Sequence, residues 1–137
     1  MAKRKRIVFR VVGNRIVGLG HIYRALALAN EFHNSQVMFI TNLTCEKYVE
    51  AVVKNKYWVG SYPASSIVKE IVKLEPDLVI NDILDTKIGD IVPIKKVGIK
   101  TVSFEDLGRG AIYTDLTINE IYDEPRFQAK HVLWGHQ

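Results

Sequence analysis

Short runs of hydrophobic residues alternate with amphipathic helical patterns along the chain. Residues 21–33 form a clear helical pattern, because their apolar positions recur every three or four residues. The alternation is typical of βαβ units and predicts an α/β fold, a Rossmann-like doubly wound parallel sheet of about six strands. The expected strands are Ile7–Val12, Gln36–Thr41, Tyr57–Tyr62, Asp77–Asn81, Lys100–Phe104 and Asp115–Ile118, with His131–Trp134 as a candidate short last strand.

Capping and helix-breaking residues predict where the helices begin and end. Thr44 is placed to cap the second helix, and a serine at 65 or 66 the third. Pro76 stops the third helix, and Gly98 is suited to the end of the fourth. We expect His33 to end the first helix, where a positive charge is favourable.

Length and composition fit one globular domain. The chain has 137 residues, of which 47% are hydrophobic. No apolar run approaches the roughly 20 residues of a membrane-spanning helix, so we expect no membrane span. The basic start is not followed by an apolar signal core, and the single cysteine, Cys45, fits a reducing compartment. We therefore expect a cytoplasmic protein.

The net charge of +4 comes from one short segment. Four of the 19 Lys and Arg residues are Lys3, Arg4, Lys5 and Arg6, and the other 15 balance the 15 Asp and Glu residues. A basic run just before a first strand is usually a solvated entry segment, and no basic patch with interleaved aromatic residues accompanies it. Nucleic acid is therefore not an expected partner.

Polar residues stand where several predicted strands end. In open α/β sheets, ligands bind outside the carboxyl ends of the strands, so this edge is the expected binding site. The polar positions are the 13–21 loop, Thr41, Asn42, Asn81, Asp82, Glu105, Asp106 and Asn119.

The loop from Gly13 to Gly20 carries the clearest chemical signal. Gly18 and Gly20 permit a tight turn and a close approach of backbone N–H groups to a ligand. The dinucleotide fingerprint does not fit, because Tyr23 stands at its third glycine and no acid ends the second strand. The Gly-Lys-Ser/Thr sequence of a Walker loop is absent.

His21 opens the helix that follows this loop. The helix dipole there disfavours the imidazolium, so His21 is suited to act as a neutral base. A hydrogen-bonding role within the loop is the alternative. Arg24 lies about one turn further on, where it would either bind phosphate or meet solvent.

Residues 18–29, GLGHIYRALALA, resemble the motif G-x-G-H-x-x-R-x-x-x-L-A of the UDP-2,4-diacetamido-2,4,6-trideoxy-β-L-altropyranose hydrolases, the nucleotide-sugar hydrolases of pseudaminic acid biosynthesis. Arg10 matches the strand arginine of that family, and residues 102–107 and 115–119 are similar to its later strands. The resemblance spans nearly the whole chain. It implies one half of a GT-B architecture, because the family is similar in fold to glycosyltransferases of the MurG type, whose two Rossmann-like domains face a cleft.

The resemblance implies that His21 is a general base that activates water for attack on the anomeric carbon and releases UDP, with no metal or other cofactor. A nucleotide sugar would be the substrate, in the biosynthesis of a surface polysaccharide. Glu105, Asp106 and Asn119 would line the sugar side of the cleft. The implied substrate-binding residues are Arg10, Gly18, Gly20, Arg24, Asp82, Glu105, Asp106 and Asn119.

The chain also departs from the family. Val12 replaces an aspartate, and Asp82-Ile83-Leu84 stands where the family has Asp-His-Tyr. We therefore expect a different sugar, with hydrolysis or transfer left open. The resemblance ends at 135–137, near the start of the family's linker to its second, nucleotide-binding domain. Residues 1–137 are thus expected to be a single Rossmann-like N-terminal domain that needs a C-terminal domain or a partner chain.

Two other functions stay open at the level of sequence. The chain could be a non-catalytic module that binds a sugar or nucleotide sugar, or a scaffold domain that pairs with another chain. Trp58 and Trp134 are expected to pack in the core or at its edge rather than stack on a sugar. Asp82, Asp85 and Asp90 are too scattered to predict a metal site.

Overall fold

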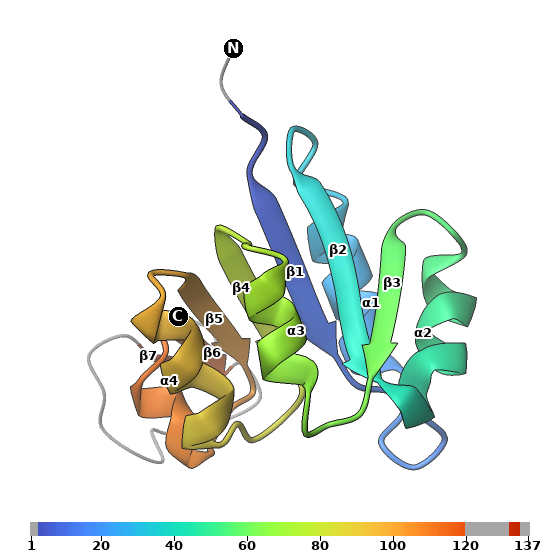
Figure 1. The fold of residues 1–137 in the computed structure, drawn as a ribbon. Coiled ribbons are helices and arrows are strands. Elements are labelled where there is room, and N and C mark those ends of the chain that lie inside the picture. The colour runs from blue at the N-terminus through green and yellow to red at the C-terminus, as the bar shows by residue number, and fades with distance from the viewer. Residues whose placement is uncertain (1–2, 120–131, 135–137) are drawn as a thin grey trace.

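The computed structural model describes residues 3–119 and 132–134. Within them, seven parallel strands form one sheet in the order β3-β2-β1-β4-β5-β6-β7 (Figure 1). The elements are β1 (Arg6–Val11), α1 (Gly20–Ala29), β2 (Gln36–Asn42), the 3-10 turn Leu43–Cys45, α2 (Glu46–Val53), β3 (Trp58–Tyr62), α3 (Ile67–Lys73), β4 (Leu78–Asp82), α4 (Ile88–Lys96), β5 (Lys100–Phe104), the 3-10 turn Arg109–Ile112, β6 (Leu116–Asn119) and β7 (Val132–Trp134).

This architecture confirms the α/β class and the six expected strands, each within one residue at either end. The candidate last strand is also present, because Val132–Trp134 pairs in parallel with β6. The described sheet therefore has seven strands rather than about six. No helix in the described part of the chain is long and apolar enough to span a membrane.

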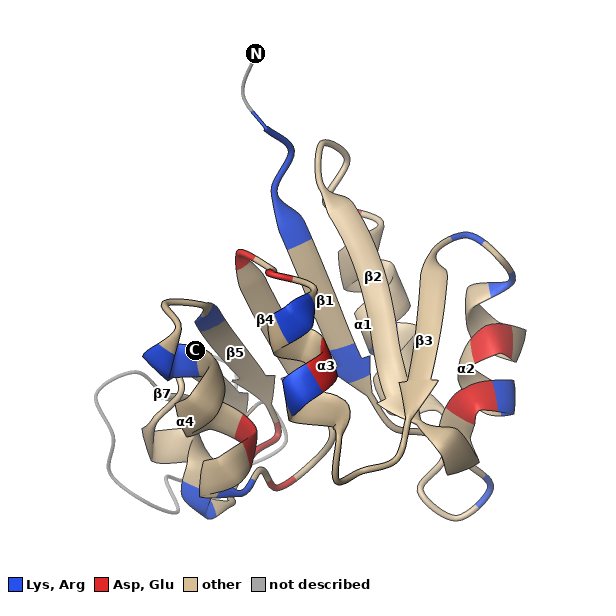
Figure 2. Ribbon diagram, viewed as in Figure 1, with Lys and Arg blue, Asp and Glu red and all other residues tan. Residues whose placement is uncertain are grey.

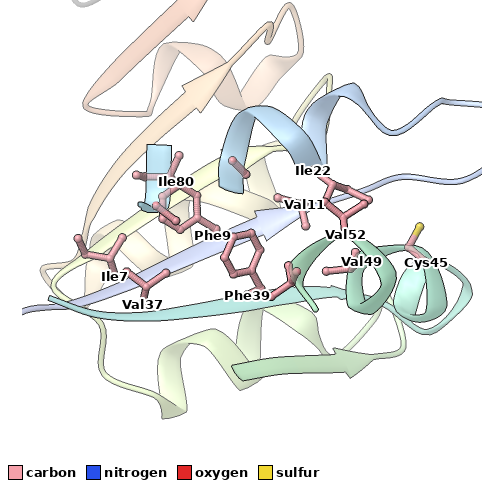
Figure 3. Close-up of a cluster of buried hydrophobic side chains, with 13 residues drawn as sticks. Ile7, Phe9, Val11, Ile22, Val37, Phe39, Cys45, Val49, Val52 and Ile80 are labelled. Carbon is pink, nitrogen blue, oxygen red and sulfur yellow. The ribbon is translucent and has the colours of Figure 1, made fainter. Parts of the chain in front are cut away.

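The two faces of the sheet hold separate cores, because alternate residues of β1 point to opposite sides. Phe9 packs on the α1 and α2 side, whereas Val8 packs on the α3 and α4 side. Figure 3 shows Phe9 next to Phe39 of β2, and their rings stack with centroids 5.3 Å apart. Figure 1 shows α1 behind the sheet and α3 and α4 in front of it.

Two of the expected helix boundaries are wrong. Helix α1 ends at Ala29, four residues before His33, because tight turns with bonds from Glu31 N to Leu28 O and from Phe32 N to Ala29 O follow it. Thr44 does not cap α2, since it lies inside the preceding 3-10 turn and Cys45 occupies the capping position.

Two other boundary residues stand where expected. Ser66 occupies the position before α3, but its hydroxyl donates to the carbonyl of Pro63 rather than accepting from the helix. Gly98 follows α4 with φ of +84°, a left-handed conformation that favours glycine.

The basic entry segment lies at the amino-terminal edge of the sheet (Figure 2). It is not wholly solvated, because Arg4 donates to the carbonyl of Ser35 at 2.9 Å and Arg6 to that of Leu74 at 2.9 Å. The opposite edge, where the strands end, holds the site predicted from the sequence. There β1 lies between β2 and β4, so the strand order reverses beside the start of α1.

Candidate functional site

The loop before α1 is held by its own hydrogen bonds. Asn14 and Gly18 exchange backbone bonds of 2.8 and 3.2 Å, and the Asn14 side-chain oxygen accepts from the N–H groups of Ile16 and Val17. Gly18 has φ of +88°, which a residue with a Cβ rarely adopts. The loop thus exposes Ile16 and Val17 and delivers His21 to the first turn of α1.

His21 is paired with Asp82, the last residue of β4. Its Nδ1 lies 2.5 Å from the Asp82 Oδ1 atom, and Asp82 is only 1% exposed. A carboxylate accepts hydrogen bonds, so the hydrogen of a neutral imidazole sits on Nδ1 and Nε2 is left as the acceptor. The contact thus fixes the orientation of the His21 ring.

Arg24 binds the same carboxylate from one turn further along α1. Its Nε donates to Asp82 Oδ2 at 2.7 Å and its Nη2 to Oδ1 at 2.6 Å, a bidentate pair. Its Nη1 donates to Glu105 at 3.3 Å, and its guanidinium lies 4.8 Å from the centroid of the Phe104 ring. Burial alone would lower the pKa of Arg24, but the two carboxylates outweigh burial and raise the pKa. Arg24 is therefore a fixed cation.

Two residues next to this cluster have left-handed backbone conformations without being glycine. Leu84 follows β4 with φ of +70°, and Glu105 follows β5 with φ of +52°. Each such conformation costs on the order of 1–3 kcal/mol and persists only where surrounding contacts enforce it. For Glu105 these contacts include the bond to Arg24 and a backbone bond to Ile118 O at 2.9 Å.

An open pocket of about 330 Å³ lies at the carboxyl edge of the sheet, and it is lined by Val17, Gly20, His21, Arg24, Leu84 and Glu105. Val17 and Leu84 give it an apolar side, and His21, Arg24 and Glu105 a polar one. The sequence motif led to His21, Gly20 and Arg24. It gives no signal for Val17, and Leu84 is a position at which the sequence departs from the family. We call this the His21 pocket.

Asp106 and Asn119, two predicted sugar-binding residues, are fully buried and bonded within the protein. The Asp106 carboxylate accepts from the backbone N–H and hydroxyl of Thr86 and from the N–H of Gly108. Asn119 bonds the backbone of Asp106 in both directions, at 2.7 and 3.2 Å. Burial raises the pKa of Asp106, while its hydrogen bonds act to lower it. Both residues hold the loop after β5 in place.

Arg10, another predicted binding residue, points to the other face of the sheet. It is on β1 with the same orientation as Val8, and its guanidinium donates to Asp90 of α4 at 2.8 Å. The alternation of side chains along a strand separates it from Val11, which packs on the α1 side. The structure therefore does not bring Arg10 into the His21 pocket.

At this edge, His21 and Arg24 form a polar cluster with Asp82 and Glu105 that lies beside the pocket. Within residues 3–119 and 132–134, no three His, Cys, Asp or Glu side chains are grouped so that they would hold a metal ion. The chemistry supported by the cluster is proton transfer at His21 Nε2 beside a fixed guanidinium.

No protein-family model matches the chain. The uncharacterized protein MJ1062 of Methanocaldococcus jannaschii is 29% identical over 114 residues, which cover 80% of this chain and 23% of that protein. The crystal structure of MurG from Acinetobacter baumannii is similar with a TM-score of 0.67 and 13% sequence identity, over 97% of this chain and 46% of the MurG chain. The chain thus spans less than half of each of these two proteins.

The similarity to MurG confirms the predicted fold. The chain has the Rossmann-like α/β architecture of part of a protein with the GT-B fold. Neither similar protein is named as a member of the hydrolase family that the sequence resembles. Hydrolysis therefore remains a hypothesis.

Proposed function

We propose that this chain forms the sugar-side wall of the active site of a nucleotide-sugar hydrolase or glycosyltransferase-like enzyme, with His21 as the general base. The observation that carries the proposal is the 2.5 Å contact between His21 Nδ1 and buried Asp82, which leaves Nε2 as the basic atom of a histidine that lines the pocket. The GT-B-like fold supports a binding site at this edge.

In the proposed hydrolysis, His21 Nε2 takes a proton from water as the water oxygen bonds to the anomeric carbon. The bond from that carbon to the phosphate oxygen breaks, and its electron pair leaves with the nucleoside diphosphate. Asp82 stabilises the imidazolium that forms, as an acidic partner of a catalytic histidine does. In a transfer reaction, an acceptor hydroxyl would take the place of the water.

Arg24 has a positioning role in this scheme. Its two bonds to Asp82 hold the carboxylate in the orientation that His21 requires. Its contact with Glu105 links the ends of β4 and β5. We also propose that a second domain or a partner chain completes the cleft, because the chain covers only 46% of MurG.

The test is nucleotide release by the full-length protein from a panel of UDP- and CMP-sugars. We expect His21→Ala to lower kcat by about 10²–10⁴-fold, the range for loss of a general base. His33→Ala is the matched control, because His33 is an exposed histidine beyond the end of α1. Equal turnover by His21→Ala and wild type would contradict the role of His21.

The same panel tests the non-catalytic alternative. The apolar side formed by Val17 and Leu84 would suit a binding module as well as an enzyme. Calorimetric binding of a nucleotide sugar without turnover by the wild-type protein would favour that module and reject the enzyme.

A further inference from the structure

A second hollow lies at the amino-terminal edge of the sheet, away from the His21 pocket. Its volume is about 560 Å³, within the range of small-molecule sites. Met38 of β2, Trp58 of β3 and Leu74 after α3 form its apolar part, and Arg4 and Lys56 stand among its polar residues. The proposed function uses none of these side chains.

Trp58 gives this hollow a flat aromatic wall. Half of its surface is exposed, which is uncommon for a tryptophan. Its indole lies across Gly60, because a Cβ on Gly60 would come within 2.5 Å of the ring. The absence of a side chain at Gly60 thus lets the indole lie along β3. The half-exposed ring is available for stacking against a ligand.

The charge of the hollow is positive. Among the described residues that line it, the charged ones are Arg4 and Lys56. Arg4 is held by its bond to Ser35 O, and Lys56 Nζ lies 5.9 Å from the centroid of the Tyr57 ring. Figure 2 shows basic residues in the entry segment and in the loop between α2 and β3, both at this end of the sheet. Glu50 belongs to an adjacent hollow.

We propose that this hollow binds a small organic anion with a flat aromatic ring, of the chemical class of a nucleoside monophosphate. The ring would stack on Trp58, and the anionic group would pair with Arg4 and Lys56. Charge complementarity disfavours a cation, and a neutral aromatic compound would gain only the stacking contact. The site is independent of the catalytic role proposed for His21, because the two lie at opposite edges of the sheet.

The first experiment titrates the purified protein with adenosine 5′-monophosphate and, separately, with adenosine, and follows the indole N–H signals by NMR. Trp134 is only 6% exposed and serves as the internal reference for Trp58. We expect the monophosphate to shift the Trp58 signal at millimolar concentration and adenosine to bind more weakly. An unmoved Trp58 signal, or equal binding of the two compounds, would overturn the proposal.

Calorimetry on variants then tests the two parts of the site. Trp58→Leu should weaken binding of the monophosphate about fivefold or more, through loss of stacking. Arg4→Gln and Lys56→Gln should each weaken it about two- to fivefold, as exposed ion pairs do. Lys96→Gln, which removes an exposed charge at the end of α4, should leave it unchanged. The site is rejected if Lys56→Gln and Lys96→Gln bind alike while both remain folded by thermal unfolding.

Discussion

Replacing Asp82 by Asn would remove the negative charge that binds His21 and Arg24 at the His21 pocket. The carboxylate accepts three hydrogen bonds, at 2.7 and 2.6 Å from Arg24 and at 2.5 Å from His21. An amide of the same shape has one acceptor oxygen, and its NH₂ group must face an N–H donor. At least one charged hydrogen bond is therefore lost, and the Arg24 guanidinium loses its main counter-charge.

The size of the effect follows from burial. A hydrogen bond to a charged group contributes about 1.5–3 kcal/mol, and breaking a fully buried ion pair costs about 3–5 kcal/mol. Asp82 is 1% exposed, but the side chain of Arg24 is 28% exposed, so water recovers part of the loss. We expect Asp82→Asn to lower the free energy of unfolding by about 2–3 kcal/mol. With an unfolding entropy of about 2.1 cal/mol/K per residue, Tm should fall by about 7–10 °C.

Urea and thermal unfolding at neutral pH measure this change. Glu31→Gln is the control, because it makes the same chemical replacement at an exposed residue beyond the end of α1. The free energy of unfolding of this control should differ from that of wild type by no more than about 0.5 kcal/mol. A double-mutant cycle with Arg24→Gln should give a coupling energy of about 1–3 kcal/mol. If Asp82→Asn is as stable as Glu31→Gln, or the cycle shows no coupling, the hydrogen bonds from Arg24 and His21 to Asp82 do not stabilise the fold and the prediction is refuted.

Three further predictions concern the loop after β5 and its neighbours. Gly108→Ala should lower the free energy of unfolding in urea by about 1–3 kcal/mol, because the added Cβ would lie 2.1 Å from Thr86 O. Gly89→Ala is the control, because its Cβ would meet open space in α4, and it should not lower the free energy of unfolding. Burial raises the pKa of Asp106 in the folded state, so wild type loses stability as pH rises above the ordinary carboxyl value of about 4. The free energy of unfolding of Asp106→Asn should therefore increase relative to that of wild type as pH rises above about 4, and a difference that does not change with pH would count against this. Burial of Asp115 is outweighed by hydrogen bonds from a lysine and from a backbone N–H, which lower its pKa. Its contribution to stability is therefore present at neutral pH and is lost as pH falls below the ordinary carboxyl value of about 4, so Asp115→Asn should be less stable than wild type at pH 7 and approach it in acid.

Much of the fold could be predicted from local sequence. Apolar runs of strand length bounded by Gly, Pro and polar residues located the strands, because a strand buried on both faces must be apolar throughout. Gly98 marked the end of α4 for a purely local reason, the left-handed backbone after the helix. The prediction that Thr44 caps α2 was wrong, because a 3-10 turn precedes α2 and moves the capping position by one residue, to Cys45. Local propensity did not specify that turn.

The site was predicted only in part. The glycine-rich loop and the start of α1 identified His21 and Arg24, because both follow from a loop that runs into a helix. Sequence placed Arg10 in the same site, but residues of one strand alternate between faces, and Arg10 faces α4. Asp106 and Asn119 stand at the predicted edge, yet they are bonded inside the loop that they support.

The sequence by itself determined the alternation of strands and helices, the edge that carries the site, and the loop that presents His21. Each of these depends on residues close together in the chain. Only the tertiary structure decided that His21 meets Asp82, 61 residues away, and that Arg24 binds the same carboxylate. The parallel pairing of β1 with β4 places the end of β4 beside the loop that leads from β1 into α1, and this pairing joins residues that are far apart in the chain.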